Sequence, residues 1–198
     1  SALHASLLAI GCGKDDEVLV PALTPLMCGL SINYTGATPV YVDSDPDTFL
    51  LCEKDLEKKI TKKTKAIMAV HMYGGVCNMS EILEIAEAHE IPILEDCAQC
   101  LCGHDDKGRI VGTMGRISCW SFENSKHLTC GEGGIAICND EVLATKVRKI
   151  GGLGYKTLTA GSGAVRTNKS MFRDPEWERF DEIGFNYRLS ELGAAVAL

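Results

Sequence analysis

The segment that runs from Ala66-Ile-Met-Ala-Val70 through Ser80-Glu-Ile-Leu-Glu-Ile-Ala-Glu-Ala-His89 to Ile91-Pro-Ile-Leu94 decides the fold. Its first and last parts are short apolar runs, as expected of strands buried on both faces. The middle part places apolar residues on one face at helical spacing, and Asn78 with Glu81 resembles a capping box at its start. We therefore predict a strand, a helix and a second, parallel strand.

The same alternation extends toward the N-terminus. We predict strands at Glu17–Pro21 and Thr38–Val42, and helices at Leu26–Tyr34 and Glu53–Ile60. Such a series is typical of a three-layer α/β/α sandwich around a mostly parallel mixed sheet. The sequence therefore predicts the α/β class.

Further elements are predicted in the C-terminal half of the chain. Two strands are expected at Ile117–Phe122 and Gly134–Cys138, followed by an aspartate-capped helix at Glu141–Lys149. The glycine-rich and polar composition of Gly151–Gly184 predicts a long loop. A last helix is predicted to begin at about Arg188.

Composition excludes several classes of protein. The 198 residues are 45% hydrophobic and 24% charged, which argues against disorder, a collagen-like repeat or a coiled coil. Lys and Arg number 20 against 27 Asp and Glu, and the net charge of −7 argues against nonspecific binding to nucleic acid or an anionic membrane. We expect neither a membrane span nor a signal peptide. The chain begins at Ser1 without Met and ends inside the apolar run Glu191–Leu198, so we expect a fragment.

Ten cysteines in a chain of this length, without a secretory signal, predict reduced thiols and a cytoplasmic protein. The densest group, Cys97-x-x-Cys100-x-Cys102-x-His104, contains residue types that bind zinc. Its ligands follow one another too closely for a common structural site, and no second Cys-x-x-Cys pair completes it. We therefore predict no metal site.

Candidate site residues follow two of the predicted strands. Open α/β sheets bind ligands beyond the carboxyl ends of their strands, where His71 and Asp96 are expected. His71 is either a ligand contact or a satisfied strand-end histidine, and Asp96 is either a functional carboxylate or the cap of a following helix. Lys126 lies between a strand that ends near Ser121 and the glycine-rich turn Gly131–Gly134. An amine, a strand-end carboxylate and small hydroxyl or glycine positions are together what pyridoxal phosphate requires.

A series of short motifs runs in order along essentially the whole chain. They are Asp16-Glu-Val-Leu-Val-Pro21, Gly36-Ala-Thr-Pro-Val-Tyr-Val-Asp43, Thr64-Lys-Ala-Ile-Met-Ala-Val-His71, Glu95-Asp-Cys-Ala-Gln99, Ser121-Phe-x-x-x-Lys126, Gly131-Glu-Gly-Gly134 and Gly184-Phe-Asn-Tyr-Arg188. Each motif alone is weak, but the ordered set resembles the DegT/DnrJ/EryC1/StrS family of sugar aminotransferases, of fold type I of the pyridoxal-phosphate enzymes. The resemblance implies that residues 1–198 form the cofactor-binding large domain, without the family's N-terminal segment and C-terminal small domain.

The resemblance also implies roles for individual residues. Lys126 would form the Schiff base with the cofactor, Asp96 would pair with its pyridine nitrogen, and Gln99 would lie near its phenolic oxygen. Ser121 would bind the cofactor phosphate, together with Ser1 at a helix N-terminus.

Other implied contacts involve a second subunit and the substrate. Asn186 matches an asparagine that in the family reaches the phosphate from the neighbouring subunit, which implies a homodimer with shared active sites. Arg188 and His71 are weaker candidates for substrate contacts, and Arg188 is equally well interpreted as a surface cation. Pro25 stands where the family often has an aromatic residue that stacks on the cofactor ring, so stacking by this residue is not expected.

The implied reaction is a ping-pong transamination. Lys126 releases the cofactor to L-glutamate or L-glutamine and then acts as general base and acid, while Asp96 keeps the ring nitrogen protonated. The amino group would pass to a keto sugar, expected to be nucleotide-linked, or to a keto cyclitol. Two alternatives stay open. One is a pyridoxal-phosphate-binding regulator without turnover, and the other is an NAD-dependent oxidoreductase, for which Gly11-x-Gly13 is a poor match without a third glycine.

Overall fold

The computed structural model describes residues 1–163 and 169–198. Its strands are β1 (Glu17–Pro21), β2 (Thr38–Val42), β3 (Thr64–Val70), β4 (Ile93–Asp96), β5 (Ile117–Ser121) and β6 (Gly134–Ile137). They form a six-stranded sheet in the order β2-β1-β3-β4-β5-β6, in which all neighbours are parallel except β5 and β6. The mostly parallel mixed sheet predicted from the sequence is confirmed.

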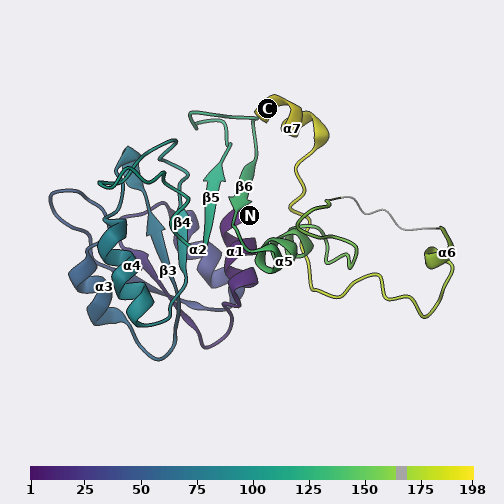
Figure 1. The fold of residues 1–198 in the computed structure, drawn as a ribbon, viewed down its shortest axis with the longest axis horizontal. Coiled ribbons are helices and arrows are strands. Elements are labelled where there is room, and N and C mark those ends of the chain that lie inside the picture. The colour runs from purple at the N-terminus through teal and green to yellow at the C-terminus, as the bar shows by residue number, and fades with distance from the viewer. Residues whose placement is uncertain (164–168) are drawn as a thin grey trace.

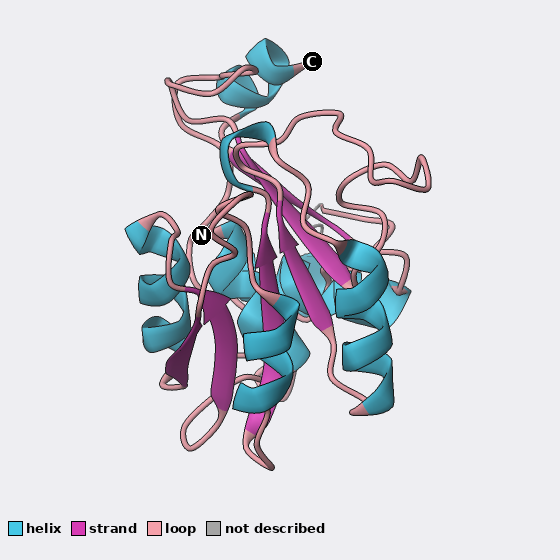
Figure 2. Cartoon of the chain, turned by 90° about the vertical axis from the view of Figure 1, so that its left-hand side faces the viewer, coloured by secondary structure: helices cyan, strands magenta, loops and turns pink. Residues whose placement is uncertain are grey.

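Helices cover the sheet on both faces. They are α1 (Ala2–Ile10), α2 (Leu26–Thr35), α3 (Glu53–Lys59), the 3-10 turn η1 (Met72–Gly74), α4 (Met79–Ala88), α5 (Glu141–Gly151), α6 (Lys169–Phe172) and α7 (Glu191–Ala197). Figure 1 shows α3 and α4 on one side of the strands and α1 and α5 on the other, and Figure 2 shows helices in front of and behind the sheet. α1 packs against both α2 and α5. The result is the three-layer arrangement expected, and within the described residues no helix has the length and apolar character needed to cross a membrane.

The predicted helix starts are confirmed for α4 and α5. Asn78 precedes α4, its side chain accepts the N–H of Glu81 at 3.4 Å, and its amide donates to the Glu81 carboxylate at 3.1 Å. Asp140 precedes α5 and accepts the N–H groups of Val142 and Leu143 at 2.8 and 3.0 Å. These bonds satisfy N–H groups that a helix leaves without partners at its start.

The core lies around the central strands. Every residue of β3 from Ala66 to Val70 is buried, as are Val18 to Pro21 of β1. Helices of both layers add fully buried side chains, among them Leu7 of α1 and Ile82 of α4. A strand covered on both faces needs apolar residues at every position, which explains the continuous apolar runs in the sequence.

Strand β4 is displaced toward the C-terminus from the predicted Ile91–Leu94. Its pairing with β3 extends to Asp96, and the N–H of Cys97 then donates to the carbonyl of Cys119 at 2.8 Å. At the other end, Pro92 has no N–H to contribute to the ladder. Asp96 is therefore the last residue of the strand and does not follow it.

The C-terminal helix begins later than predicted. α7 starts at Glu191 and not near Arg188, because the hydroxyl of Ser190 caps it by accepting the N–H of Gly193 at 3.1 Å. The capping serine was the local signal for this boundary. It places Arg188 in the irregular segment before the helix.

The long loop predicted at Gly151–Gly184 is largely confirmed. Among its described residues are the short helix α6 and two isolated bridges, Tyr155 with Phe180 and Thr159 with Ser162. Residues 164–168 of the predicted loop lie outside the described residues.

Candidate functional site

The carboxyl ends of β4 and β5 place three predicted site residues at one edge of the sheet. Asp96 is the last residue of β4, and Ser121 is the last residue of β5. Lys126 lies in the loop from β5 to β6, where its N–H donates to the carbonyl of Glu123 at 3.0 Å. Because β4 and β5 are parallel, their ends meet at the same edge, which is where α/β sheets bind ligands.

The Asp96 carboxylate is buried, and each of its oxygens accepts a hydrogen bond. Oδ1 accepts the N–H of Ala98 at 3.0 Å, and Oδ2 accepts the S–H of Cys28 in α2 at 3.2 Å. Residues 97–100 form a turn and no helix. The alternative interpretation of Asp96 as a helix cap is therefore wrong.

Burial is the main cause of a raised pKa at Asp96. The N–H of Ala98 and the thiol of Cys28 oppose this shift, as does the nearby Lys126 through its charge. A carboxylate whose pKa is raised by burial is stabilised in its ionised form by a cation in direct contact with it. A protonated pyridine nitrogen is such a cation, so the surroundings of Asp96 fit the role expected of it.

Lys126 and Ser121 line the same small cavity. The rest of its wall consists of small, apolar and aromatic residues: Cys97, Ala98, Leu101, Trp120, Phe122, His127 and Leu128. The ammonium group of Lys126 is close enough to lower the pKa of Asp96. The structure therefore brings the amine, the hydroxyl and the carboxylate into one neighbourhood.

The N-terminus of α1 lies beside the end of β5. Ser121 pairs with Gly134 in β6, and a Cβ placed on Gly134 would lie 3.9 Å from the Cβ of Ala2. Ser1 is the N-cap of α1 and makes no side-chain cap bond, while its carbonyl accepts the N–H of Ala5 at 2.9 Å. The first N–H groups of a helix attract anions. Ser1 and Ser121 therefore occupy a corner that suits a phosphate.

Gln99 lies in the turn that follows β4. Its Oε1 accepts the N–H of Tyr73 at 3.0 Å, and Tyr73 has a left-handed φ of 54°. This bond leaves the side-chain NH2 group of Gln99 as the end that can donate to a cofactor oxygen. The orientation is compatible with the predicted ring contact.

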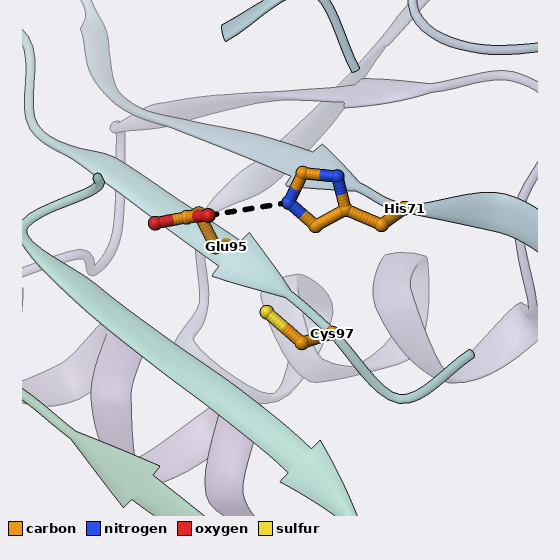
Figure 3. A group of neighbouring side chains, drawn as sticks. All are labelled: His71, Glu95 and Cys97. Carbon is orange, nitrogen blue, oxygen red and sulfur yellow. Dashed lines mark hydrogen bonds and ion pairs between the residues drawn. The ribbon is translucent and has the colours of Figure 1, made fainter. Parts of the chain in front are cut away.

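His71 does not belong to this group of residues. It is fully buried, its Nδ1 accepts the N–H of Cys77 at 3.2 Å, and its Nε2 lies 3.2 Å from Oε2 of Glu95 (Figure 3). A neutral imidazole carries one N–H, so Nε2 holds the proton and donates it to Glu95. The structure contradicts the prediction of a substrate contact and supports a satisfied strand-end histidine.

Glu95 points to the face of β4 opposite Asp96, because successive side chains of a strand alternate. Oε2 accepts the N–H of Gly112 at 2.7 Å, and Oε1 accepts those of Met114 at 2.8 Å and Gly115 at 2.5 Å. Burial alone would raise the pKa of Glu95, but His71 and these N–H groups outweigh it and lower the pKa. We call Glu95, His71 and residues 112–115 the Glu95 brace.

The same brace explains a cluster that resembles a metal site. Ligand atoms of His71, Glu95 and Cys97 lie within 4.8 Å of one another. Nε2 of His71 is protonated, the Glu95 oxygens already accept N–H groups, and burial raises the pKa of the Cys97 thiol far above its usual value. Hydrogen bonds therefore account for His71 and Glu95, and the Cys97 thiol keeps its proton, whereas a metal needs unprotonated ligands. Within the described residues, the run Cys97–His104 does not gather its three cysteines and its histidine into a ligand group.

Asn186 and Arg188 lie on an exposed segment before α7. Nε of Arg188 donates to Oδ1 of Asn186 at 2.9 Å. Tyr187 attaches the segment to the domain, because its N–H donates to the carbonyl of Gly151 at 2.9 Å and its hydroxyl lies 2.9 Å from Nδ1 of His4. Among the described residues, neither side chain bonds to the three residues at the sheet edge. Their exposure is what a contact with a neighbouring subunit requires.

Sequence reasoning missed Cys28 and Glu95. Glu95 had a signal, because a charged residue inside an apolar strand requires buried partners. Cys28 had none, since its partner Asp96 is 68 positions away.

Gly11 closes α1 and does not open a dinucleotide loop. It has φ 96°, and its N–H donates to the carbonyls of Leu7 and Leu8 at 3.2 and 3.0 Å. A dinucleotide fingerprint follows a strand and opens a helix, whereas Gly11 and Gly13 follow a helix. The arrangement therefore disfavours the NAD-dependent alternative.

Known proteins share both the sequence and the fold. A model of the DegT/DnrJ/EryC1/StrS aminotransferase family matches residues 1–198. The chain is 43% identical over 197 residues to GDP-perosamine synthase of Escherichia coli O157:H7, a match that covers 100% of this chain and 49% of that protein. The chain thus spans about half the length of this relative.

Solved structures agree with the sequence match. The aminotransferase from Psychrobacter cryohalolentis superposes with a TM-score of 0.86 at 33% identity, over 99% of this chain and 48% of that one. NtdA from Bacillus subtilis, solved with bound cofactor PMP, gives a TM-score of 0.81 at 28% identity, over 99% of this chain and 40% of that one. The chain therefore belongs to the DegT/DnrJ/EryC1/StrS aminotransferase family, whose members depend on pyridoxal phosphate.

Proposed function

We propose that this chain is the cofactor-binding part of a pyridoxal-phosphate-dependent aminotransferase. In the proposed reaction, an amino group moves from L-glutamate or L-glutamine to a nucleotide-linked keto sugar or to a keto cyclitol. One observation carries the proposal. A buried carboxylate, Asp96, lies near the amine of Lys126 at the carboxyl edge of the parallel strands.

The residues at this edge fit the three polar parts of pyridoxal phosphate. Asp96 is a buried anion whose two bonded partners, Ala98 and Cys28, are uncharged, and the protonated ring nitrogen would supply its cation. Ser121 and Ser1 lie beside a helix N-terminus and would hold the phosphate. Lys126 provides an amine for the aldehyde.

Each residue then has a defined task. When bound, pyridoxal phosphate supplies an aldehyde that condenses with amines and a protonated ring that withdraws electrons from the substrate carbon. The amine of Lys126 would hold the cofactor in the absence of an amino donor. With a donor bound, Nζ of Lys126 would accept a proton from the substrate carbon and return it. Asp96 would stabilise the proton on the ring nitrogen, because its negative charge lies in a buried position.

Of the two proposed acceptors, the nucleotide-linked keto sugar is anionic. The Escherichia coli relative is named for a GDP-linked sugar, and this similarity supports a nucleotide-linked keto sugar here. Because the net charge is −7, local groups must hold such a ligand. Arg188 is our candidate cation for this task, in the site of a neighbouring subunit.

The proposal includes the surroundings of the site. We infer that residues 1–198 are the large domain of a longer protein that acts as a homodimer with shared active sites, Asn186 reaching the partner's phosphate. The chain spans about half the length of its relative, and Asn186 is exposed, both of which support this view. All ten cysteines are free thiols, which supports the reducing cytoplasm as the compartment.

Absorption spectroscopy of the full-length protein tests the proposal. We expect a visible band from the lysine-bound cofactor, which disappears when L-glutamate or L-glutamine is added. Lys126→Ala should lack the band, whereas Lys107→Ala, which removes an exposed loop lysine, should keep it. A wild-type protein that binds no cofactor would overturn the proposal. A band that persists with both donors would support a regulator without turnover.

Mass spectrometry of the products identifies the acceptor. Nucleotide keto sugars and keto-inositols are supplied to the donor-treated protein, and an aminated product is expected with the true acceptor only. Amination of keto-inositols alone would overturn the choice of a nucleotide-linked sugar.

A further inference from the structure

The thiol of Cys28 is bonded to the carboxylate that the proposed function assigns to the cofactor nitrogen. Cys28 lies in the first turn of α2 with 0% exposure, and its Sγ is 3.2 Å from Oδ2 of Asp96. Its N–H donates to the carbonyl of Pro25 at 3.0 Å, and its carbonyl accepts the hydroxyl of Ser31 at 2.9 Å. The backbone of Cys28 is therefore fixed on both sides.

The chemistry of the two groups determines the direction of this bond. An ionised carboxylate only accepts hydrogen bonds, so the thiol is the donor. Burial, followed by the charge of Asp96, raises the pKa of the Cys28 thiol well above its usual value. The thiol therefore keeps its proton at physiological pH and presents an S–H group to Asp96.

We propose that Cys28 is a positioning residue for Asp96, an inference that rests on the proposed role of Asp96 toward the cofactor. The S–H of Cys28 binds one carboxylate oxygen and the N–H of Ala98 binds the other. Two bonds on two oxygens fix the plane of the carboxylate. Each carboxylate oxygen keeps a further lone pair, which lies in the plane of the carboxylate. Fixing this plane therefore fixes the direction in which the lone pair can accept a proton from the ring nitrogen.

A thiol suits this task because it is a weak donor. It orients Asp96 but lowers the basicity of the carboxylate only slightly. Asp96 therefore remains basic enough to hold a proton on the ring nitrogen. The other titratable groups facing Asp96 are Lys126, His71, Cys97 and Cys119. Burial raises the pKa of Cys119 to about 12, so this thiol also stays neutral. Among the described residues, none of these four groups is bonded to the carboxylate, whereas Cys28 is.

Cofactor affinity of the full-length protein separates positioning from packing. Cys28→Ala removes the donor and is expected to weaken pyridoxal phosphate binding about fivefold, the size of one modest hydrogen bond. Cys28→Ser retains a donor and is expected to stay within about twofold of wild type. Cys12→Ala removes a buried thiol elsewhere in the core and should leave the affinity unchanged. Equal weakening in the Ala and Ser variants of Cys28 would assign it to packing and overturn the inference.

Infrared spectroscopy of the cofactor-free protein tests the bond independently of the cofactor. The difference between wild type and Cys28→Ala isolates the S–H stretching band of Cys28. We expect this band at lower frequency than that of Cys12, obtained in the same way, and we expect the shift to vanish in Asp96→Ala. An unshifted S–H band in a protein that binds the cofactor would overturn the role of Cys28 but not the proposed function. A shifted band in a protein that binds no cofactor would overturn the proposed function and, with it, the role of Cys28.

Discussion

Nε2 of His71 lies 3.2 Å from Oε2 of Glu95, and both side chains are fully withdrawn from solvent. The two residues stand at the ends of neighbouring strands, and Glu95 also binds three N–H groups of residues 112–115. The Glu95 brace therefore joins β3, β4 and this segment directly behind Asp96. It fixes the strand end that carries the proposed cofactor ligand without touching the cofactor side.

Glu95→Gln is expected to lower the free energy of unfolding by about 2–3 kcal/mol, because the amide turns an NH2 group toward backbone donors. Urea denaturation of the cofactor-free protein measures this loss. Glu87→Gln, at an exposed position of α4, makes the same chemical change without buried partners. Similar losses in the two variants would show that the brace contributes nothing specific.

The lowered pKa of Glu95 predicts a loss of stability in acid. Its folded pKa lies below the unfolded value of about 4.3, so the folded protein favours the ionised form. The stabilisation is fully present above the unfolded pKa and is lost as the pH falls through the lower folded pKa. Thermal melting between neutral and acidic pH should therefore show a steeper decline for wild type than for Glu95→Gln. Parallel curves would contradict this assignment.

Asp96→Asn is expected to raise the free energy of unfolding of the cofactor-free protein at neutral pH, whereas Glu95→Gln lowers it. Burial raises the folded pKa of Asp96 above its unfolded value of about 3.9, so ionised Asp96 destabilises the cofactor-free protein at neutral pH. The variant should be more stable by about 1 kcal/mol at neutral pH, and the gain should disappear below the unfolded pKa. Its affinity for pyridoxal phosphate should fall more than about tenfold. A variant that melts below wild type at neutral pH would refute this account.

Gly112 has no room for a side chain. With φ +84°, its Cβ would lie 2.2 Å from ring atoms of Trp120, whereas Gly108, with φ +75°, has nothing within 4 Å. Both substitutions to Ala meet the cost of a left-handed backbone. Gly112→Ala should lose about 2 kcal/mol more than Gly108→Ala, because it also displaces the partly buried ring of Trp120. Tryptophan fluorescence during urea denaturation compares the two variants, and equal losses would argue against the clash.

Asp96, Ser121 and Lys126 could be found from sequence for a simple geometric reason. The carboxyl ends of parallel strands coincide whatever the order of the strands, so polar residues after apolar runs converge. The strand order itself depends on contacts between distant segments and is not contained in the local pattern.

Other parts of the site depend on long-range contacts. The direction of the His71 ring is set by its hydrogen bonds to Glu95 and Cys77. His71 follows the last residue of β3, so the alternation of side chains along the strand does not predict this direction. The bond between Cys28 and Asp96 joins a helix to a strand across the core. Such pairs become visible only when the layers are assembled.

The candidate site draws its residues from segments far apart in the chain. Ser1 caps α1, Cys28 lies in α2, Asp96 ends β4 and Lys126 lies in the loop after β5. No short segment holds enough of them to bind the cofactor, so binding must follow the late, slow registration of parallel strands. The cofactor then stabilises only the finished fold by mass action. The supply of cofactor is therefore expected to govern how long the folded protein persists, and not how fast it forms.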